Sequence, residues 1–106
     1  MANTRAVAGT QVEFDADNHM ANATIWNRQI ADALAAEEGI VPLNERHWKV
    51  IDFMRADYQA TGAAPTIRRL TKESGVETKE LYQLFPKGPA KKAARIAGLP
   101  KPKGCI

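Results

Sequence analysis

The residue best suited to chemistry in this chain is its single cysteine, Cys105, which stands second from the end of the 106-residue sequence. Free cysteines in folded domains are usually buried, whereas a thiol beside a chain end is hard to bury and stays open to reaction. The alternative is a cysteine without a function on a frayed terminus. The residue types around Cys105 favour a functional thiol.

The segment that carries Cys105 is too rich in Pro and Gly for helix or sheet. Pro100 and Pro102 fix φ and remove two backbone donors, and Gly98 and Gly104 flank them. From Gly98 to Cys105 an extended segment spans at most about 25 Å. We therefore expect a helical domain of residues 1–97 and a flexible arm of residues 98–106 that brings the thiol into a partner's pocket.

The charges near Cys105 predict no strong activation of the thiol. Lys101 and Lys103 favour the thiolate, the nucleophilic form, and the adjacent terminal carboxylate opposes it. On a solvated arm these effects are screened. Activation would then come from a partner's pocket or from docking of the arm beside Arg68 and Arg69.

Composition indicates one ordinary globular domain, since 44% of the residues are hydrophobic and 25% are charged. No apolar run approaches the roughly 18 residues of a membrane span, and the first residues lack a signal-peptide pattern. One cysteine excludes an internal disulfide and a paired-cysteine zinc site. We expect a cytoplasmic protein with no metal, cofactor or membrane partner.

Positive charge is concentrated at the C-terminal end. The net charge is +3, yet residues 1–85 hold nine cations against all twelve acids. Residues 86–106 contain no acid, which indicates a surface that faces a partner. Their six cations are Lys87, Lys91, Lys92, Arg95, Lys101 and Lys103.

The sequence predicts a mainly α fold (α+β), a small helical bundle with a short N-terminal β-hairpin in residues 6–15. A first helix is expected from residues 22–24 to Gly39, with Trp26 on its apolar face. The next follows the N-cap Asn44, ends at Gly62 and forms the centre of the core. Three shorter helices are predicted, from Pro65 to residue 75, over 78–85 and over 89–97.

Two of these helices carry candidate binding residues. Helices 65–75 and 78–85, joined by a Gly-containing turn, have helix-turn-helix spacing, which any small helical bundle shares. The last helix presents four alanines for close packing, and Lys91, Lys92 and Arg95 form an outward cationic stripe.

Other catalytic signals are weak. His19 and His47 have no neighbour at metal-ligand spacing and are interpreted as surface or satisfied histidines. No Ser/His/Asp set and no P-loop is present, and Lys87 beside a helix start is at most a minor anion site. The large aromatic side chains are assigned to the core. The chain therefore shows no machinery for stand-alone hydrolytic or redox catalysis.

Three blocks of the sequence resemble the DsrC/TusE family of small sulfur-carrier proteins. The most specific is the tail, which reads LFPKGPAKKAARIAGLPKPKGCI over residues 84–106. Residues 47–53 with 65–70, and residues 37–40, are also similar to the family. The likeness spans nearly the whole chain.

The resemblance implies a mostly helical domain with a hairpin, a helix-turn-helix-like part and a mobile arm whose penultimate cysteine accepts sulfur as a persulfide. Here that acceptor is Cys105, on an arm shaped by Gly98, Pro100, Pro102 and Gly104. Donors of the TusBCD/DsrEFH type and an acceptor that thiolates tRNA or serves sulfur metabolism are expected. The family performs sulfurtransferase half-reactions rather than stand-alone turnover.

Two departures from the family pattern matter. Members that work with dissimilatory sulfite reductase carry a second arm cysteine, and the matching position here is Ala94. An intramolecular disulfide is therefore impossible, although one thiol suffices for a persulfide. TusE members often have a longer link between the residues that match 67–74 and 81–85, whereas the link here is short, as in some DsrC proteins.

The rival hypothesis is a regulatory nucleic-acid-binding protein. It would use the helix-turn-helix-like region with Arg68, Arg69 and Lys72, together with the basic last helix. The net negative charge of residues 1–85 makes nucleic-acid binding the weaker interpretation.

Overall fold

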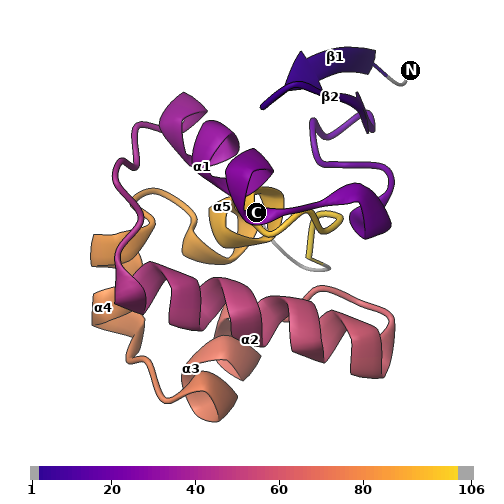
Figure 1. The fold of residues 1–106 in the computed structure, drawn as a ribbon. Coiled ribbons are helices and arrows are strands. Elements are labelled where there is room, and N and C mark those ends of the chain that lie inside the picture. Colours follow the sequence, from indigo (N-terminus) through magenta and orange to yellow (C-terminus); the bar gives the residue numbers. More distant parts are fainter. Residues whose placement is uncertain (1–2, 103–106) are drawn as a thin grey trace.

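The computed structural model describes residues 3–102 (Figure 1). In this part of the chain a hairpin of β1 (Asn3–Val7) and β2 (Thr10–Phe14) precedes a short 3-10 helix, η1 (Ala23–Ile25), and five α-helices. This architecture confirms the predicted mainly α class with a small β part. The helices are α1 (Arg28–Glu37), α2 (Glu45–Thr61), α3 (Ile67–Ser74), α4 (Thr78–Leu84) and α5 (Pro89–Ile96).

The hairpin begins three residues earlier than predicted. Its strands are antiparallel, with Val7 opposite Thr10 and Asn3 opposite Phe14. Alternation along β2 places Val12 and Phe14 on one face, and both are fully buried. This face covers one end of the helical layer, and β1 contacts α1.

Helix α5 lies at the centre of the molecule, between α1 and α2 (Figure 1), and it contacts each of the other four α-helices. The prediction that α2 is the central helix was therefore wrong. The predicted small-residue face explains the arrangement, because alanine side chains let neighbouring helices approach closely from several sides. Ala90, Ala93, Ala94 and Ala97 are all buried.

Helix α2 has the boundaries that the sequence predicted. The Asn44 side chain accepts hydrogen bonds from the backbone N–H groups of Arg46 and His47, and the His47 ring accepts one from the Asn44 N–H. At the other end Gly62 takes the left-handed conformation, and its N–H bonds to the Tyr58 carbonyl. Each end of α2 is therefore fixed by contacts between residues no more than four positions apart.

The predicted first helix is divided in two. Asn22 caps η1 and Asn27 caps α1, and each side chain accepts a backbone N–H. Trp26 lies between the two caps in an extended conformation, with ψ of 145°. It is therefore outside the helix on which it was predicted.

The start of α3 also differs by two residues from the prediction. Thr66 is the N-cap of α3, because its hydroxyl accepts a hydrogen bond from the N–H of Arg69, and Pro65 therefore lies before the helix. The predicted end at Gly75 is confirmed, as is α4 followed by the buried Phe85. The two short helices pack against each other and against α5.

Candidate functional site

The C-terminal end of α5 is held by three side chains that come from distant parts of the chain. The Trp26 indole Nε1 donates to the Ile96 carbonyl at 2.8 Å, and Arg55 Nη1 donates to the Ala97 carbonyl at 2.8 Å. His19 Nδ1 lies 2.9 Å from the Leu99 carbonyl. We call Trp26, Arg55 and His19 the C-terminal clasp. It fixes the end of α5 and the turn through Leu99 that precedes Pro100.

Each member of the clasp is itself held in place. The Arg55 guanidinium stacks over the Trp26 ring at 4.1 Å from its centroid and also donates to the Ala23 carbonyl. His19 lies in a turn whose backbone is bound by Asp15, because the Asp15 carboxylate accepts the His19 N–H at 3.0 Å. The clasp therefore joins one fully buried side chain, His19, to two half-buried ones, Trp26 and Arg55, at the edge of the core.

Gly98 is required where the chain passes Trp26. Its φ is +75°, in the region that favours glycine, and a Cβ at this position would lie 2.6 Å from Trp26 Cδ1. The next residue, Leu99, is 1% exposed, and its N–H bonds to the Ala94 carbonyl at 2.9 Å. The predicted boundary of the arm at residue 98 thus falls where the chain is still packed and hydrogen-bonded.

The remaining predicted arm residues divide into two groups. Pro102 is buried, and Pro100 and Lys101 are half-buried, so the described part of the segment follows the surface of the domain. Lys103, Gly104 and Cys105 lie outside the described residues. The predictions made for them stay predictions.

The outward cationic stripe on α5 was wrong for one of its three members. Arg95 is 6% exposed, and its guanidinium donates to the Asn18 carbonyl at 2.8 Å and to Glu37 at 2.8 Å. Lys92 is half-buried and lies 3.8 Å from Glu38. Only Lys91 is exposed. The prediction was wrong because α1 lies against this face of α5. The sequence did not show that the acidic end of α1 would be placed there.

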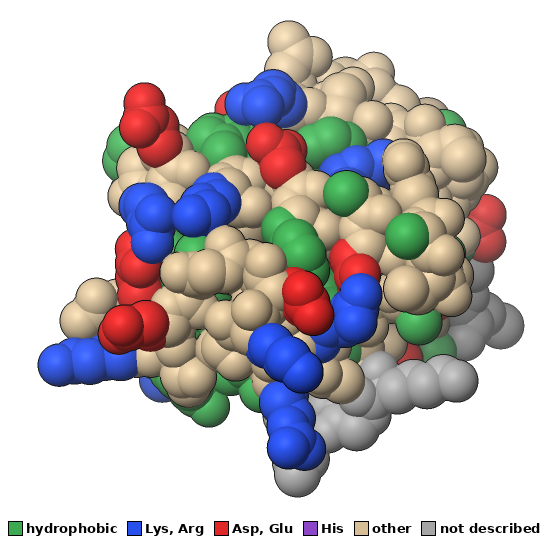
Figure 2. Space-filling view, turned by 90° about the horizontal axis from the view of Figure 1, so that it is seen from below, with side chains coloured by type: hydrophobic (Ala, Val, Ile, Leu, Met, Phe, Trp, Pro, Cys, Tyr) green, Lys and Arg blue, Asp and Glu red, His purple; other side chains and the backbone are tan. Residues whose placement is uncertain are grey.

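Arg69 is also engaged within the domain. Its guanidinium makes a bidentate contact with the carboxylate of Asp57, whose side chain is 6% exposed. Arg68 is exposed and forms no ion pair with the described residues. On the side of α3 shown in Figure 2, Lys and Arg side chains alternate with Asp and Glu and form no continuous basic surface.

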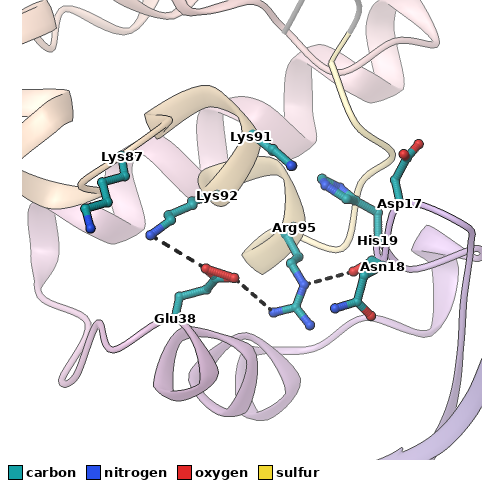
Figure 3. Close-up of a pocket in the computed structure, with 8 residues that line it drawn as sticks. All are labelled: Asp17, Asn18, His19, Glu38, Lys87, Lys91, Lys92 and Arg95. Carbon is teal, nitrogen blue, oxygen red and sulfur yellow. Dashed lines mark hydrogen bonds and ion pairs between the residues drawn. The ribbon is translucent and has the colours of Figure 1, made fainter. Parts of the chain in front are cut away.

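A polar hollow of about 280 Å³ opens beside α5, between the end of α1 and the turn that carries His19 (Figure 3). Four of its lining side chains are cationic and two are acidic. Glu38 lies near both Lys92 and Arg95, whereas Lys87 and Lys91 form no ion pair within residues 3–102. We call it the basic hollow. Its lining residues are Asp17, Asn18, His19, Glu38, Lys87, Lys91, Lys92 and Arg95.

The two histidines have different surroundings. Both ring nitrogens of His47 are hydrogen-bonded, to the Asn44 N–H and the Leu84 carbonyl, as predicted for a satisfied histidine. His19 is fully buried and bonds through Nδ1 only, and its Nε2 has no partner among the described residues. Burial lowers the pKa of His19 below its ordinary value, and the hydrogen bond to Leu99 partly offsets this.

Within residues 3–102 no group of three or more His, Cys, Asp and Glu side chains is arranged to hold a metal ion. No helix in this range is long and apolar enough to cross a membrane.

Comparison with known proteins identifies the chain. The profile of the family described as "DsrC like protein" matches residues 6–106. This chain belongs to the DsrC-like family. The match extends through the tail that holds Cys105, and it confirms the resemblance seen in the sequence.

Individual relatives of this DsrC-like protein fall in both branches of the family. It is 46% identical over 105 positions to sulfurtransferase TusE of Yersinia pseudotuberculosis, with 92% of this chain and 96% of that protein covered. It is 40% identical over 98 positions to the gamma subunit of the dissimilatory-type sulfite reductase of Nitratidesulfovibrio vulgaris, with 92% and 93% covered. The solution structure of Allochromatium vinosum DsrC superposes with a TM-score of 0.84 at 41% identity and covers all of both chains.

The lengths of these alignments differ between the two relatives. Coverage of 92% of 106 residues is about 98 residues, yet the TusE alignment spans 105 positions, so TusE has residues that this DsrC-like protein lacks. The alignment with the sulfite reductase gamma subunit spans 98 positions.

Sequence reasoning missed the C-terminal clasp. Trp26 was predicted on the apolar face of a helix, His19 was interpreted as a surface or satisfied histidine, and Arg55 was given no role. The only local hint in the sequence was a large apolar side chain, Trp26, between Asn22 and Asn27. That pattern does not predict a contact with residue 96.

Proposed function

We propose that this DsrC-like protein is a sulfur carrier in which Cys105 accepts and passes on a persulfide. The observation that carries the proposal is the family match through residue 106, which includes the only cysteine. Relatives at 46% and 40% identity are named sulfurtransferase TusE and a sulfite reductase subunit. Both names belong to sulfur chemistry.

The loading step is a thiol exchange. The Cys105 thiolate attacks the outer sulfur of a donor persulfide R–S–SH, the S–S bond of the donor breaks, and R–S⁻ leaves, so that Cys105–S–SH forms. Delivery repeats the exchange with an acceptor thiolate as the nucleophile. These are half-reactions between proteins and not the turnover of a stand-alone enzyme.

The fold supports this role by fixing one end of the arm. The clasp and the buried Leu99 anchor the chain, and Cys105 lies six positions beyond Leu99. At 3.3–3.6 Å per residue this span reaches at most about 22 Å. The thiol can therefore enter a partner's pocket while the domain remains folded.

We assign the partners by chemical class. Donors of the TusBCD/DsrEFH type would load Cys105, and a tRNA-thiolating or sulfur-metabolism enzyme would unload it, in the cytoplasm, where a thiol stays reduced. Lys91, Arg68 and Lys101 are the better docking cations, because Arg69 and Arg95 are held by carboxylates within the domain. Because Ala94, buried in α5, stands where other members carry the second cysteine, transfer proceeds without an intramolecular disulfide.

The nucleic-acid-binding alternative is not carried forward. The relatives reported above have no nucleic-acid-binding name, Arg69 is bound to Asp57, and charges of both signs alternate on the side of α3 (Figure 2).

Intact-mass measurement tests the proposal. Reduced protein incubated with glutathione persulfide should gain the mass of one sulfur atom, and a thiol reductant should remove it. Cys105→Ser should fold normally by circular dichroism and gain nothing. A gain of equal size in Cys105→Ser, or no gain in the wild type with any persulfide donor, would refute the carrier role.

A further inference from the structure

The basic hollow contains one hydrogen-bond acceptor among its cations. The Leu99 carbonyl can only accept a hydrogen bond, so His19 Nδ1 donates and carries the proton. In the neutral imidazole Nε2 is then an unprotonated acceptor, and it is buried without a partner among the described residues. Figure 3 shows the ring at the edge of the hollow, with the Lys91 side chain extending toward it.

A second buried atom in the hollow also has no hydrogen-bond partner among the described residues. Arg95 Nη1 lies 3.6 Å from a Glu38 oxygen, which is an ion-pair distance and not a hydrogen bond. The hollow thus offers an acceptor, a buried guanidinium N–H and the ammonium of Lys91. Buried polar groups normally find partners, so this set of atoms is suited to binding a small polar group.

The donor and acceptor pattern selects a particular chemistry. A ligand that donates a hydrogen bond to Nε2 and can carry a negative charge beside Lys91 and Arg95 would match both features of the hollow. A carboxylate or a phosphodiester has no proton to give at neutral pH, whereas a thiol with a pKa of about 8.5 has one. Transfer of that proton would leave a thiolate close to two cations, which favour it.

We propose that the basic hollow receives a thiol group, with His19 Nε2 accepting its proton and Lys91 and Arg95 stabilising the thiolate. This inference rests on the proposed carrier function and names the group that activates the attacking sulfur. In the step R–SH loses its proton to Nε2, the thiolate attacks the outer sulfur of a persulfide, and the proton passes from the imidazolium to the departing thiolate. No oxidant or reductant is consumed.

Two thiols have this chemistry. One is the thiol of Cys105 during loading, since the span of six positions after Leu99 reaches at most about 22 Å and Leu99 itself bonds to His19. The other is the thiol of an acceptor protein during delivery. The experiment below separates them.

Burial of His19, more than the charges around it, keeps its Nε2 unprotonated near neutral pH. Asp15 and Asp17 on its own turn favour the imidazolium, and Arg95 on α5 opposes it together with burial. The other charged groups that line the hollow are Glu38, Lys87, Lys91 and Lys92. The burial of His19 is the largest of these effects, so the acceptor is available at the pH at which a thiol still holds its proton.

The variant that isolates Nε2 is His19→Asn. The amide nitrogen of asparagine takes the place of Nδ1 and keeps a donor for the Leu99 carbonyl, while nothing replaces Nε2. Lys91→Gln removes a cation from the hollow, and Lys72→Gln removes an equally exposed cation from α3 as the matched control. Urea unfolding of each variant shows whether the fold is intact.

Three rates are measured from pH 6.5 to pH 10: alkylation of Cys105 by iodoacetamide, its loading by glutathione persulfide, and release of sulfur from loaded protein to N-acetylcysteine. At pH 7 His19→Asn should slow at least one of them about tenfold or more, and Lys91→Gln less. Above about pH 9.5 the wild type and variants should converge, because the thiol is ionised without a base.

The outcomes distinguish the sources and the possible failures. Slower alkylation and loading identify the thiol of Cys105, and slower release alone identifies an acceptor thiol. Equal rates in wild type and His19→Asn at pH 7 would overturn the inference, as would a deficit that persists unchanged at pH 10. Absence of loading in the wild type would instead overturn the carrier function, and the alkylation rates would still test the hollow.

Discussion

The contact between Gly98 and Trp26 gives the sharpest test of how the arm is anchored. In Gly98→Ala the new Cβ would lie 2.6 Å from Trp26 Cδ1 and 2.9 Å from Trp26 Cβ. The second atom lies next to the backbone, so a simple rotation of the ring does not relieve the overlap. The residue must also keep a φ of +75°, which costs alanine about 1–2 kcal/mol.

The displacement of Trp26 adds to this cost. It weakens the indole hydrogen bond to the Ile96 carbonyl, worth about 0.5–1.5 kcal/mol, and the stacking with Arg55, worth about 0.5–1 kcal/mol. We therefore expect Gly98→Ala to lower the free energy of unfolding by about 2–4 kcal/mol. A domain of this size is stable by about 5–15 kcal/mol, so the variant should still fold.

Gly62→Ala is the matched control. Gly62 has a φ of +78° and no atom within 4 Å of an added Cβ, so it isolates the cost of the backbone conformation. Urea unfolding followed by circular dichroism should show that Gly62→Ala lowers the free energy of unfolding by about 1–2 kcal/mol. A Trp26→Ala background removes Cδ1 and Cγ but keeps the Cβ at 2.9 Å, so there the cost of Gly98→Ala should fall part of the way to the control value. Equal costs for the two glycine variants in the wild-type background would refute the clash.

Two further predictions concern charges near α5. Arg95→Gln should lower the free energy of unfolding by about 2 kcal/mol or more, because it removes a buried guanidinium from the Asn18 carbonyl and from Glu37. Lys91→Gln on the same helix should change it by less than about 0.5 kcal/mol, and similar urea midpoints for the two would contradict the burial of Arg95. The pKa of Glu37 lies at about 2, chiefly because Arg5 donates hydrogen bonds to it. Because the folded-state pKa is lowered, the ion pair contributes stability that is fully present above the ordinary pKa near 4.5. This contribution is lost as the pH falls toward 2. Solvent screening of this partly exposed carboxylate leaves about 1 kcal/mol. The Tm advantage of the wild type over Glu37→Gln should therefore shrink between pH 5 and pH 2, and a difference independent of pH would count against the ion pair.

Much of this protein was predictable from short stretches of sequence. The ends of α2 follow from Asn44 and Gly62, because capping involves residues within four positions of each other. The alanine face of α5 and the hairpin follow from period and composition. The candidate thiol follows from one cysteine in a Pro- and Gly-rich tail, and the family follows from the same residues.

The sequence did not predict which charges remain available to a partner. Arg95 and Lys91 are both cations on one short helix, and only the packing of α1 against α5 buries the first and leaves the second exposed. Likewise Arg69 and Arg68 are neighbours, and only the position of Asp57 on α2 separates their roles. Ion pairing depends on which segments meet, and that depends on the whole core.

The sequence by itself determined the family and the candidate thiol, because both are written in contiguous residues. Only the tertiary structure decided how the C-terminal end of α5 is held. His19 and Leu99 are 80 residues apart, and Trp26 and Ile96 are 70 apart. No local rule joins such pairs. They meet because burial of the apolar faces of α1, α2 and α5 brings three distant side chains to one helix end, where the unpaired carbonyls of that end require donors.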